Sequence, residues 1–79
     1  MHRTTVPKLE DVFRAILRIP QGVDVTTLSQ GDVPEWDSLA HVSLILALEG
    51  EFGVEIDAVD AADLTSFDAT AQYLEGHGL

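Results

Sequence analysis

The sequence lacks the residue types that most often build metal and thiol chemistry. It contains no cysteine, which excludes disulfide bonds, thiolate zinc sites and a cysteine nucleophile. Its three histidines, His2, His41 and His77, are too scattered to predict a zinc site. Residues 57–63 contain three aspartates but not the Asp-x-Asp-x-Asp-Gly pattern of an EF-hand loop. The sequence therefore predicts no bound metal.

Basic residues are absent from most of the chain. All of them lie in the first 18 residues, namely Arg3, Lys8, Arg14 and Arg18. Residues 19–79 contain aspartates and glutamates but no lysine or arginine. The formal net charge is −10 at pH 7. Such a surface repels nucleic acid and anionic membranes and attracts basic patches on protein partners. The same charge also favours solubility, so it excludes partners better than it identifies them.

Long apolar runs are missing as well. No stretch approaches the roughly 20 apolar residues of a membrane span, and the N-terminus lacks the apolar core of a signal peptide. A chain of 79 residues suffices for one small domain, without room for a deep substrate pocket. We therefore expect a single domain over 1–79, monomeric and cytoplasmic, with no nucleic-acid or membrane partner.

Apolar periodicity predicts an all-α fold, a four-helix bundle with three main helices and one short third helix. The first helix begins near Pro7 and ends before Pro20 and Gly22. Its apolar residues recur at helical spacing: Leu9, Val12, Phe13, Ile16 and Leu17. The long loop that follows, residues 19–36, is of a length that is often functional. Three of its residues are expected to pack on the core: Val23, Val25 and Leu28.

The second helix is predicted over residues 37–52, with Asp37 or Ser38 as its N-cap and Gly53 just beyond its end. It is apolar almost all round. We therefore expect a central helix that packs on more than one side and also exposes an apolar patch. Five residues are assigned to one face, which Leu44 and Leu48 widen: Leu39, Val42, Ile45, Leu46 and Phe52.

A short third helix within 57–63 and a fourth helix capped by Thr65 or Ser66 complete the predicted bundle. Asp68 stands three residues after Thr65, a spacing close to that of a capping box. The inward stripe of the fourth helix is assigned to Phe67, Ala71 and Leu74.

The Asp37-Ser38 pair is the strongest candidate for a functional site. Before an apolar helix, such a pair is most often only a cap. Here a long loop precedes it, and a helix N-terminus supplies backbone N–H groups that favour a phosphodiester. We expect Ser38 to be covalently modified, with His41 as a surface residue beside the attached group and in contact with its phosphate.

A serine hydrolase is the alternative chemistry for the same residues. His41 lies three residues after Ser38 and could approach it on a helix. Asp37, however, points about 100° away around the helix axis, so it cannot orient the imidazole. The sequence also lacks the Gly-x-Ser-x-Gly elbow and an evident oxyanion hole. We therefore predict a protein without enzymatic activity.

Trp36 has two interpretations, because it directly precedes the cap. It can pack on the first turn of the following helix in the manner of a hydrophobic staple. Alternatively, it is a partner-facing aromatic side chain beside the modified serine.

Residues 36–56, WDSLAHVSLILALEGEFGVEI, resemble the signature region of acyl carrier proteins. Asp-Ser-Leu, then a valine three residues on, then Leu-Glu-x-x-Phe-Gly-Val-x-Ile is far more specific than the tripeptide alone. The likeness covers nearly the whole chain, including the long loop and the short acidic third segment. It implies a four-helix bundle with one short helix.

The resemblance also implies a cofactor and partners. Ser38 would accept 4′-phosphopantetheine from coenzyme A through a phosphopantetheinyl transferase, and acyl groups would be bound to this arm as thioesters. Asp37 would help the magnesium-dependent transferase to position its metal and the serine. Acyl-loading and acyl-processing enzymes would then dock on surface residues around the arm: Trp36, Leu39, Val42 and Glu49.

One departure from the family bears on the pathway. Many fatty-acid carriers are acidic along the second helix just after the serine, whereas this chain has Ala40, His41 and Ser43 there. This difference favours a discrete carrier of polyketide or other specialised metabolism. Two alternatives stay open: an aminoacyl or peptidyl carrier, and an unmodified helical interaction domain.

Overall fold

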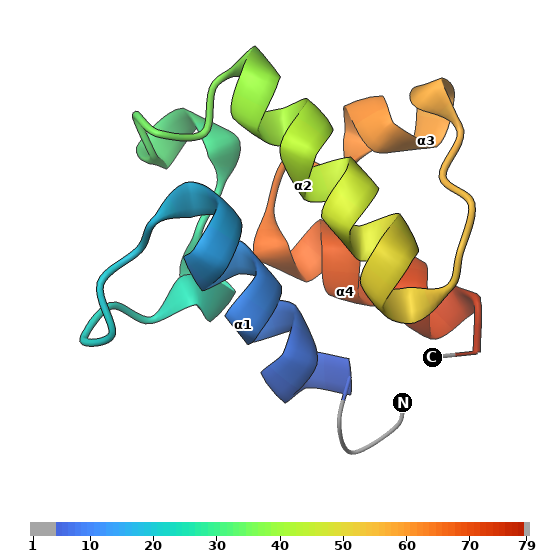
Figure 1. Cartoon of the computed structure of the whole chain (residues 1–79), viewed down its shortest axis with the longest axis horizontal. Helices are drawn as coiled ribbons and strands as arrows, with labels where there is room; N and C mark the ends of the chain where they lie inside the picture. The colour runs from blue at the N-terminus through green and yellow to red at the C-terminus, as the bar shows by residue number, and fades with distance from the viewer. Residues whose placement is uncertain (1–4, 79) are drawn as a thin grey trace.

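Four helices form the structure, a computed structural model that describes residues 5–78 (Figure 1). They are α1 (Thr5–Leu17), α2 (Ser38–Phe52), α3 (Ala58–Asp63) and α4 (Phe67–Gly76). Two short 3₁₀ turns, η1 (Val25–Thr27) and η2 (Gln30–Asp32), lie in the loop between α1 and α2. Within the described residues the only β-pairing is an isolated bridge between Ser29 and Ser66. The predicted all-α fold with a short third helix is confirmed.

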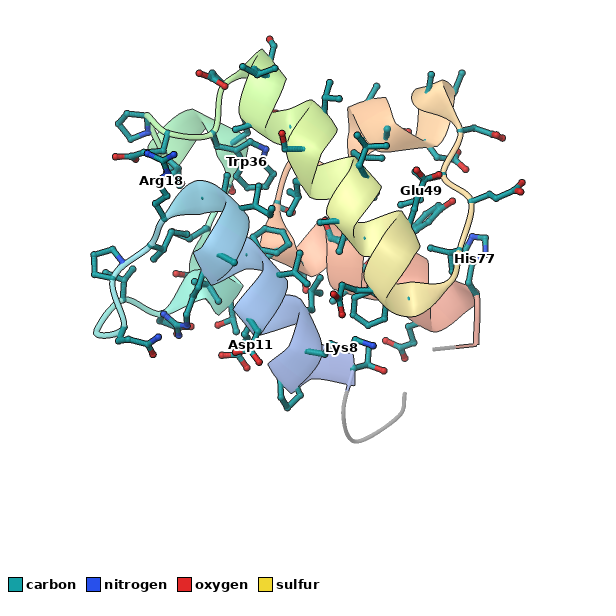
Figure 2. The ribbon with its side chains drawn as sticks, viewed as in Figure 1. Lys8, Asp11, Arg18, Trp36, Glu49 and His77 are labelled. Carbon is teal, nitrogen blue, oxygen red and sulfur yellow. The ribbon has the colours of Figure 1, made fainter. Side chains whose placement is uncertain are left out.

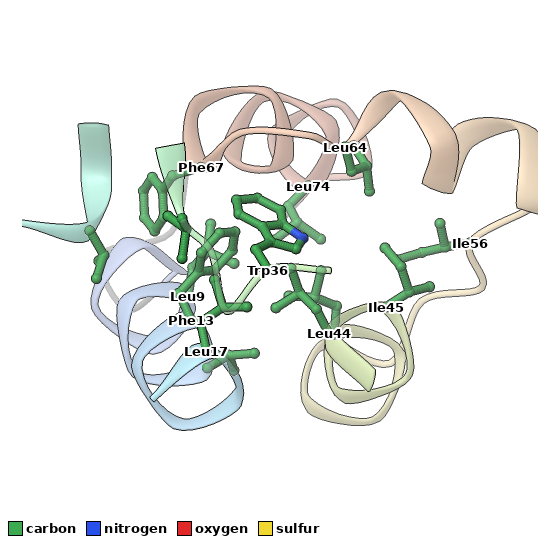
Figure 3. Close-up of a cluster of buried hydrophobic side chains, with 14 residues drawn as sticks. Leu9, Phe13, Leu17, Trp36, Leu44, Ile45, Ile56, Leu64, Phe67 and Leu74 are labelled. Atoms are coloured by element: carbon green, nitrogen blue, oxygen red, sulfur yellow. The ribbon is translucent and has the colours of Figure 1, made fainter. Parts of the chain in front are cut away.

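The core lies between α1, α2 and α4 (Figure 3). Phe13 of α1 is at its centre and makes edge-to-face contacts with Trp36 and Phe67, at ring-centroid distances of 5.4 and 5.0 Å. Such contacts add to the apolar area that the three rings bury. The side chains of largest volume that are fully enclosed include five leucines: Leu9, Leu17, Leu44, Leu48 and Leu74.

The loop between α1 and α2 is fixed to the bundle at several points. Val25 is buried and Leu28 is half-buried, as predicted, but Val23 is 41% exposed and does not belong to the core. Backbone hydrogen bonds from Gln30 N to Thr65 O (2.7 Å) and from Phe67 N to Leu28 O (3.0 Å) join the loop to the start of α4. The loop can therefore present the start of α2 as a fixed structure.

Local capping residues define the ends of α2 and α4. Asp37 is the N-cap of α2, and Gly53 ends this helix in the left-handed conformation with φ +66°. In α4 the cap is Ser66, whose Oγ accepts a hydrogen bond from Ala69 N. The capping box predicted between Thr65 and Asp68 is wrong, because Thr65 lies one residue before the cap.

The residues assigned to one face of α2 divide between the core and the surface. Leu44, Ile45 and Leu48 are buried, whereas three residues of the predicted face are exposed: Leu39 by 77%, Val42 by 56% and Leu46 by 63%. A helix that is apolar on every side has no polar stripe from which its orientation can be inferred. The predicted helix and its exposed apolar patch are confirmed, with Leu39 and Val42 in that patch, but the sequence did not predict which residues pack inward.

Candidate functional site

Ser38 is the first residue of α2, and its side chain is exposed. The preceding Asp37 is extended (φ −87°, ψ −174°), and its Oδ1 accepts a hydrogen bond from Ala40 N at 2.8 Å. This bond satisfies one of the backbone N–H groups that lack an acceptor within the helix. The positive end of the helix dipole and the remaining amides lie next to the serine, an arrangement that favours an attached phosphate.

An open groove of about 440 Å³ adjoins this turn, between the end of α1 and the start of α2. Ile16 and Leu39 give it apolar walls, and Arg18 brings the only basic side chain that lines it. Arg18 has φ +56°, a left-handed conformation that turns the chain sharply at the end of α1. Sequence analysis missed this groove, because nothing in the pattern of either helix indicates that these two ends lie close together.

Trp36 is part of the core rather than of the partner surface. Its side chain is only 2% exposed, so the interpretation as a partner-facing aromatic residue is wrong. Trp36 has a structural role, as the first interpretation proposed, but it packs on α1 as well as on α2. The indole packs on Phe13 and stacks on His41, with a distance of 6.0 Å between the ring centroids of Trp36 and His41.

His41 is turned toward α3, not toward a group on Ser38. Its Nδ1 lies 3.0 Å from Trp36 Nε1, and its Nε2 lies 2.7 Å from the carbonyl oxygen of Ala61. The side chain is half-buried. The prediction of a surface histidine in contact with a phosphate is therefore wrong, because both ring nitrogens already have partners within the protein.

These contacts also leave no catalytic triad around Ser38. Asp37 caps the helix, as predicted, instead of orienting His41, and neither nitrogen of His41 is free to accept the proton of Ser38. Among residues 5–78 no cluster of three His, Asp or Glu side chains could hold a metal ion. His2 lies outside the described residues.

Glu49 lies near the end of α2 and points toward the segment that leads into α3 (Figure 2). Its Oε2 accepts a hydrogen bond from Ile56 N at 2.9 Å, and the side chain is half-buried. The structure thus gives Glu49 a role in fixing this segment. Its predicted role in partner binding stays a prediction.

Leu39, Val42 and Leu46 form an exposed apolar strip on α2, starting next to Ser38. Their spacing of three and four residues places them on one side of the helix. Val59 of α3 is exposed to the same degree as Leu39, at 77%. Exposed apolar side chains in such a row are typical of a surface that binds other proteins.

No helix in the described part of the chain is both long and apolar enough to cross a membrane.

Comparison with known families gives the context of this turn. The family model described as a phosphopantetheine attachment site matches residues 35–74, which include Asp37 and Ser38. The chain belongs to the acyl carrier protein family. Proteins of this family carry covalently attached 4′-phosphopantetheine and are carriers, not enzymes.

Among curated proteins, this chain is similar to chloroplastic acyl carrier proteins of plants. It is 30% identical to acyl carrier protein 4 of Arabidopsis thaliana over 90% of its own length and 52% of that protein. Identity is also 30% with acyl carrier protein 1 of Hordeum vulgare and of Spinacia oleracea, over 92% of this chain in both cases and 49% and 53% of those proteins. The chain thus spans about half the length of these relatives. The family predicted from the sequence is confirmed, and the predicted cytoplasmic location stays a prediction.

Proposed function

We propose that Ser38 is the residue that carries 4′-phosphopantetheine. Its exposure at the first position of α2, next to the positive end of the helix, is the observation that supports this assignment. Once attached, the arm supplies a terminal thiol that holds acyl groups as thioesters. The Ser38 oxygen would bond to the phosphorus of coenzyme A that bears pantetheine, and the P–O bond to adenosine 3′,5′-bisphosphate would break. The proton of Ser38 would pass to a base of the transferase, and the bisphosphate would leave.

The neighbouring residues of the chain would position this serine for the transferase. Asp37 holds the first turn in place through Ala40 N, and its side chain remains exposed. A magnesium ion in the transferase could therefore reach the second carboxylate oxygen without disturbing the cap. Leu39 and Val42 would supply apolar contacts to the transferase and to acyl-processing enzymes.

The pathway that we propose is polyketide or another specialised metabolism. The exposed side of α2 after Ser38 consists of Leu39, Val42, Ser43 and Leu46, without an acidic residue in this stretch. Enzymes that recognise carriers through basic patches would therefore find no acidic side chains to pair with in this stretch. An apolar surface of this kind fits partners with apolar docking sites, and the cargo could be acyl or aminoacyl.

Intact-mass measurement after incubation with coenzyme A, magnesium and a broad-specificity transferase tests the attachment site. We expect the protein to gain the mass of one phosphopantetheine. Ser38→Ala should gain nothing, because the nucleophilic oxygen is missing. Ser43→Ala is the matched control, since it removes another exposed hydroxyl of α2, and it should be loaded like the original protein.

Two outcomes would contradict the proposal. Loading of Ser38→Ala would place the modification elsewhere, and failure of the original protein to load with several transferases would favour an unmodified interaction domain. If Ser38 is loaded, mass spectrometry of the thioester on protein isolated from its native host would distinguish an acyl cargo from an aminoacyl cargo.

A further inference from the structure

His41 connects three parts of the molecule that are distant in sequence. Its ring belongs to α2, its Nδ1 contacts the indole nitrogen of Trp36 in the preceding loop, and its Nε2 contacts the carbonyl oxygen of Ala61 in α3. The residue in α3 lies 20 positions further along the chain. These two hydrogen bonds, at 3.0 and 2.7 Å, are not needed for the helical structure of α2 itself.

The partners determine where the proton of this imidazole resides. The indole nitrogen of Trp36 can only donate a hydrogen bond, so Nδ1 of His41 must accept it and carries no proton. The carbonyl oxygen of Ala61 can only accept, so Nε2 must carry the proton and donate. The geometry therefore requires a neutral imidazole protonated at Nε2.

Helix α3 is anchored mainly by its ends and by a few side-chain contacts, and of its own residues Ala61 packs on the core. It has only six residues, none of them fully buried, and a helix this short is unstable on its own. Buried residues flank it, Ile56 before and Leu64 after. The other side-chain hydrogen bond to α3 runs from Tyr73 Oη to Asp60 Oδ2 at 3.2 Å, longer than the contact of His41.

We propose that His41 is a positioning residue: its neutral, Nε2-protonated imidazole joins the Trp36 turn before Ser38 to α3 and so fixes α3 beside α2. Both elements that flank the exposed start of α2 are then held by one side chain. A partner that approaches Ser38 meets Leu39 and Val42 of α2, and His41 sets where Val59 of α3 stands relative to them. The inference does not depend on modification of Ser38 and can be tested on the unmodified protein.

Nuclear magnetic resonance of the ¹⁵N-labelled protein tests the proposal directly. We expect long-range imidazole spectra to show His41 protonated at Nε2 only. The single indole N–H of the protein should exchange slowly with solvent, because Trp36 is buried and donates to His41. A proton on Nδ1, or rapid exchange of the indole N–H, would overturn the proposal.

Substitution then measures what the side chain does for α3. In His41→Phe the ring stack remains possible while both hydrogen bonds are lost. We expect amide hydrogen exchange in α3 to be faster by about tenfold, with exchange in α1 unchanged. His41→Gln retains one acceptor and one donor and should restore part of the protection.

The matched control is His77→Gln, which alters an exposed histidine whose ring centroid lies 4.5 Å from that of Tyr73, with the two rings tilted by 41°. It should leave the exchange of α3 unchanged. Native-like protection of α3 in His41→Phe would show that α3 does not need the imidazole. If His41→Phe does not fold, the tautomer of the original protein and the protection of α3 in His41→Gln decide the question.

Discussion

At the scale of single residues, Asp37 combines two roles that one pair of substitutions can separate. It caps α2 by accepting a hydrogen bond from Ala40 N, and this bond contributes to stability. We also propose that its carboxylate charge attracts the magnesium ion of the transferase. Asparagine is as good an N-cap as aspartate but has no charge, whereas alanine provides neither function.

We therefore expect Asp37→Ala to lower the free energy of unfolding by about 1 kcal/mol and Asp37→Asn to leave it nearly unchanged. Both variants should be loaded with phosphopantetheine much more slowly than the original protein. Urea unfolding and the initial rate of mass gain measure the two effects. Normal loading of Asp37→Asn would show that the carboxylate acts only as a cap.

Tyr73, the only tyrosine of the chain, gives a pH-dependent prediction. Burial raises the pKa of its hydroxyl above the usual value of 10.0, and the hydrogen bond to Asp60 raises it further. Because the folded state keeps this proton to higher pH than the unfolded chain, the associated stability is complete below pH 10 and is lost as the pH rises through the folded pKa.

Absorbance of the tyrosinate ion during alkaline titration should therefore show a midpoint above 10 in the folded protein. Asp60→Asn removes the negative charge beside the hydroxyl and should move the midpoint downward. Tyr73 in urea-unfolded protein is the reference. Equal midpoints for folded and unfolded protein would contradict the prediction.

At the scale of elements, α2 owes its boundaries to local conformation and its orientation to packing. Two glycines near its C-terminal end show the difference. Gly53 has φ +66°, where a side chain is strained, whereas Gly50 lies within the helix. An added Cβ would meet no atom within 4 Å at either position, so only the backbone conformation distinguishes them.

We expect Gly53→Ala to destabilise the protein by about 1–2 kcal/mol, because the left-handed conformation is strained for a residue with a Cβ atom. Gly50→Ala should stabilise it by up to about 1 kcal/mol, because alanine favours the helix. Urea unfolding of both variants measures the difference. A stabilising effect of Gly53→Ala would mean that this residue does not hold a positive φ in solution.

At the scale of the whole molecule, the apolar residues of α2 divide between the core and the surface. Leu44 is fully buried and Leu39 is 77% exposed, although both are leucines of the same helix. The burial of Leu44 contributes to the stability of a small domain, whereas the exposure of Leu39 adds nothing to it. We assign the exposed leucine to partner binding.

Leu44→Ala should lower the free energy of unfolding by about 2–5 kcal/mol, enough to unfold much of a domain this small. Leu39→Ala should change it by less than about 0.5 kcal/mol but raise the KM for the transferase several-fold. Thermal unfolding and loading kinetics measure the two effects. If Leu39→Ala is loaded with an unchanged KM, the transferase does not use this end of the strip.

The sequence by itself determined the features that depend on neighbouring residues. The helices, the cap at Asp37 and the left-handed Gly53 follow from hydrogen bonds and backbone conformations within a few residues. The exposed serine at the start of α2 follows from the same local pattern. The motif around it was specific enough to indicate the family.

Only the tertiary structure decided which side chains meet across the bundle. It turned Leu46 outward, buried Trp36, and paired His41 with Ala61 of α3. None of these follows from periodicity, because α2 is apolar on all sides and its orientation depends on packing against α1 and α4. The histidine that the sequence placed beside the serine thus points into the bundle, since its two hydrogen-bond partners lie there.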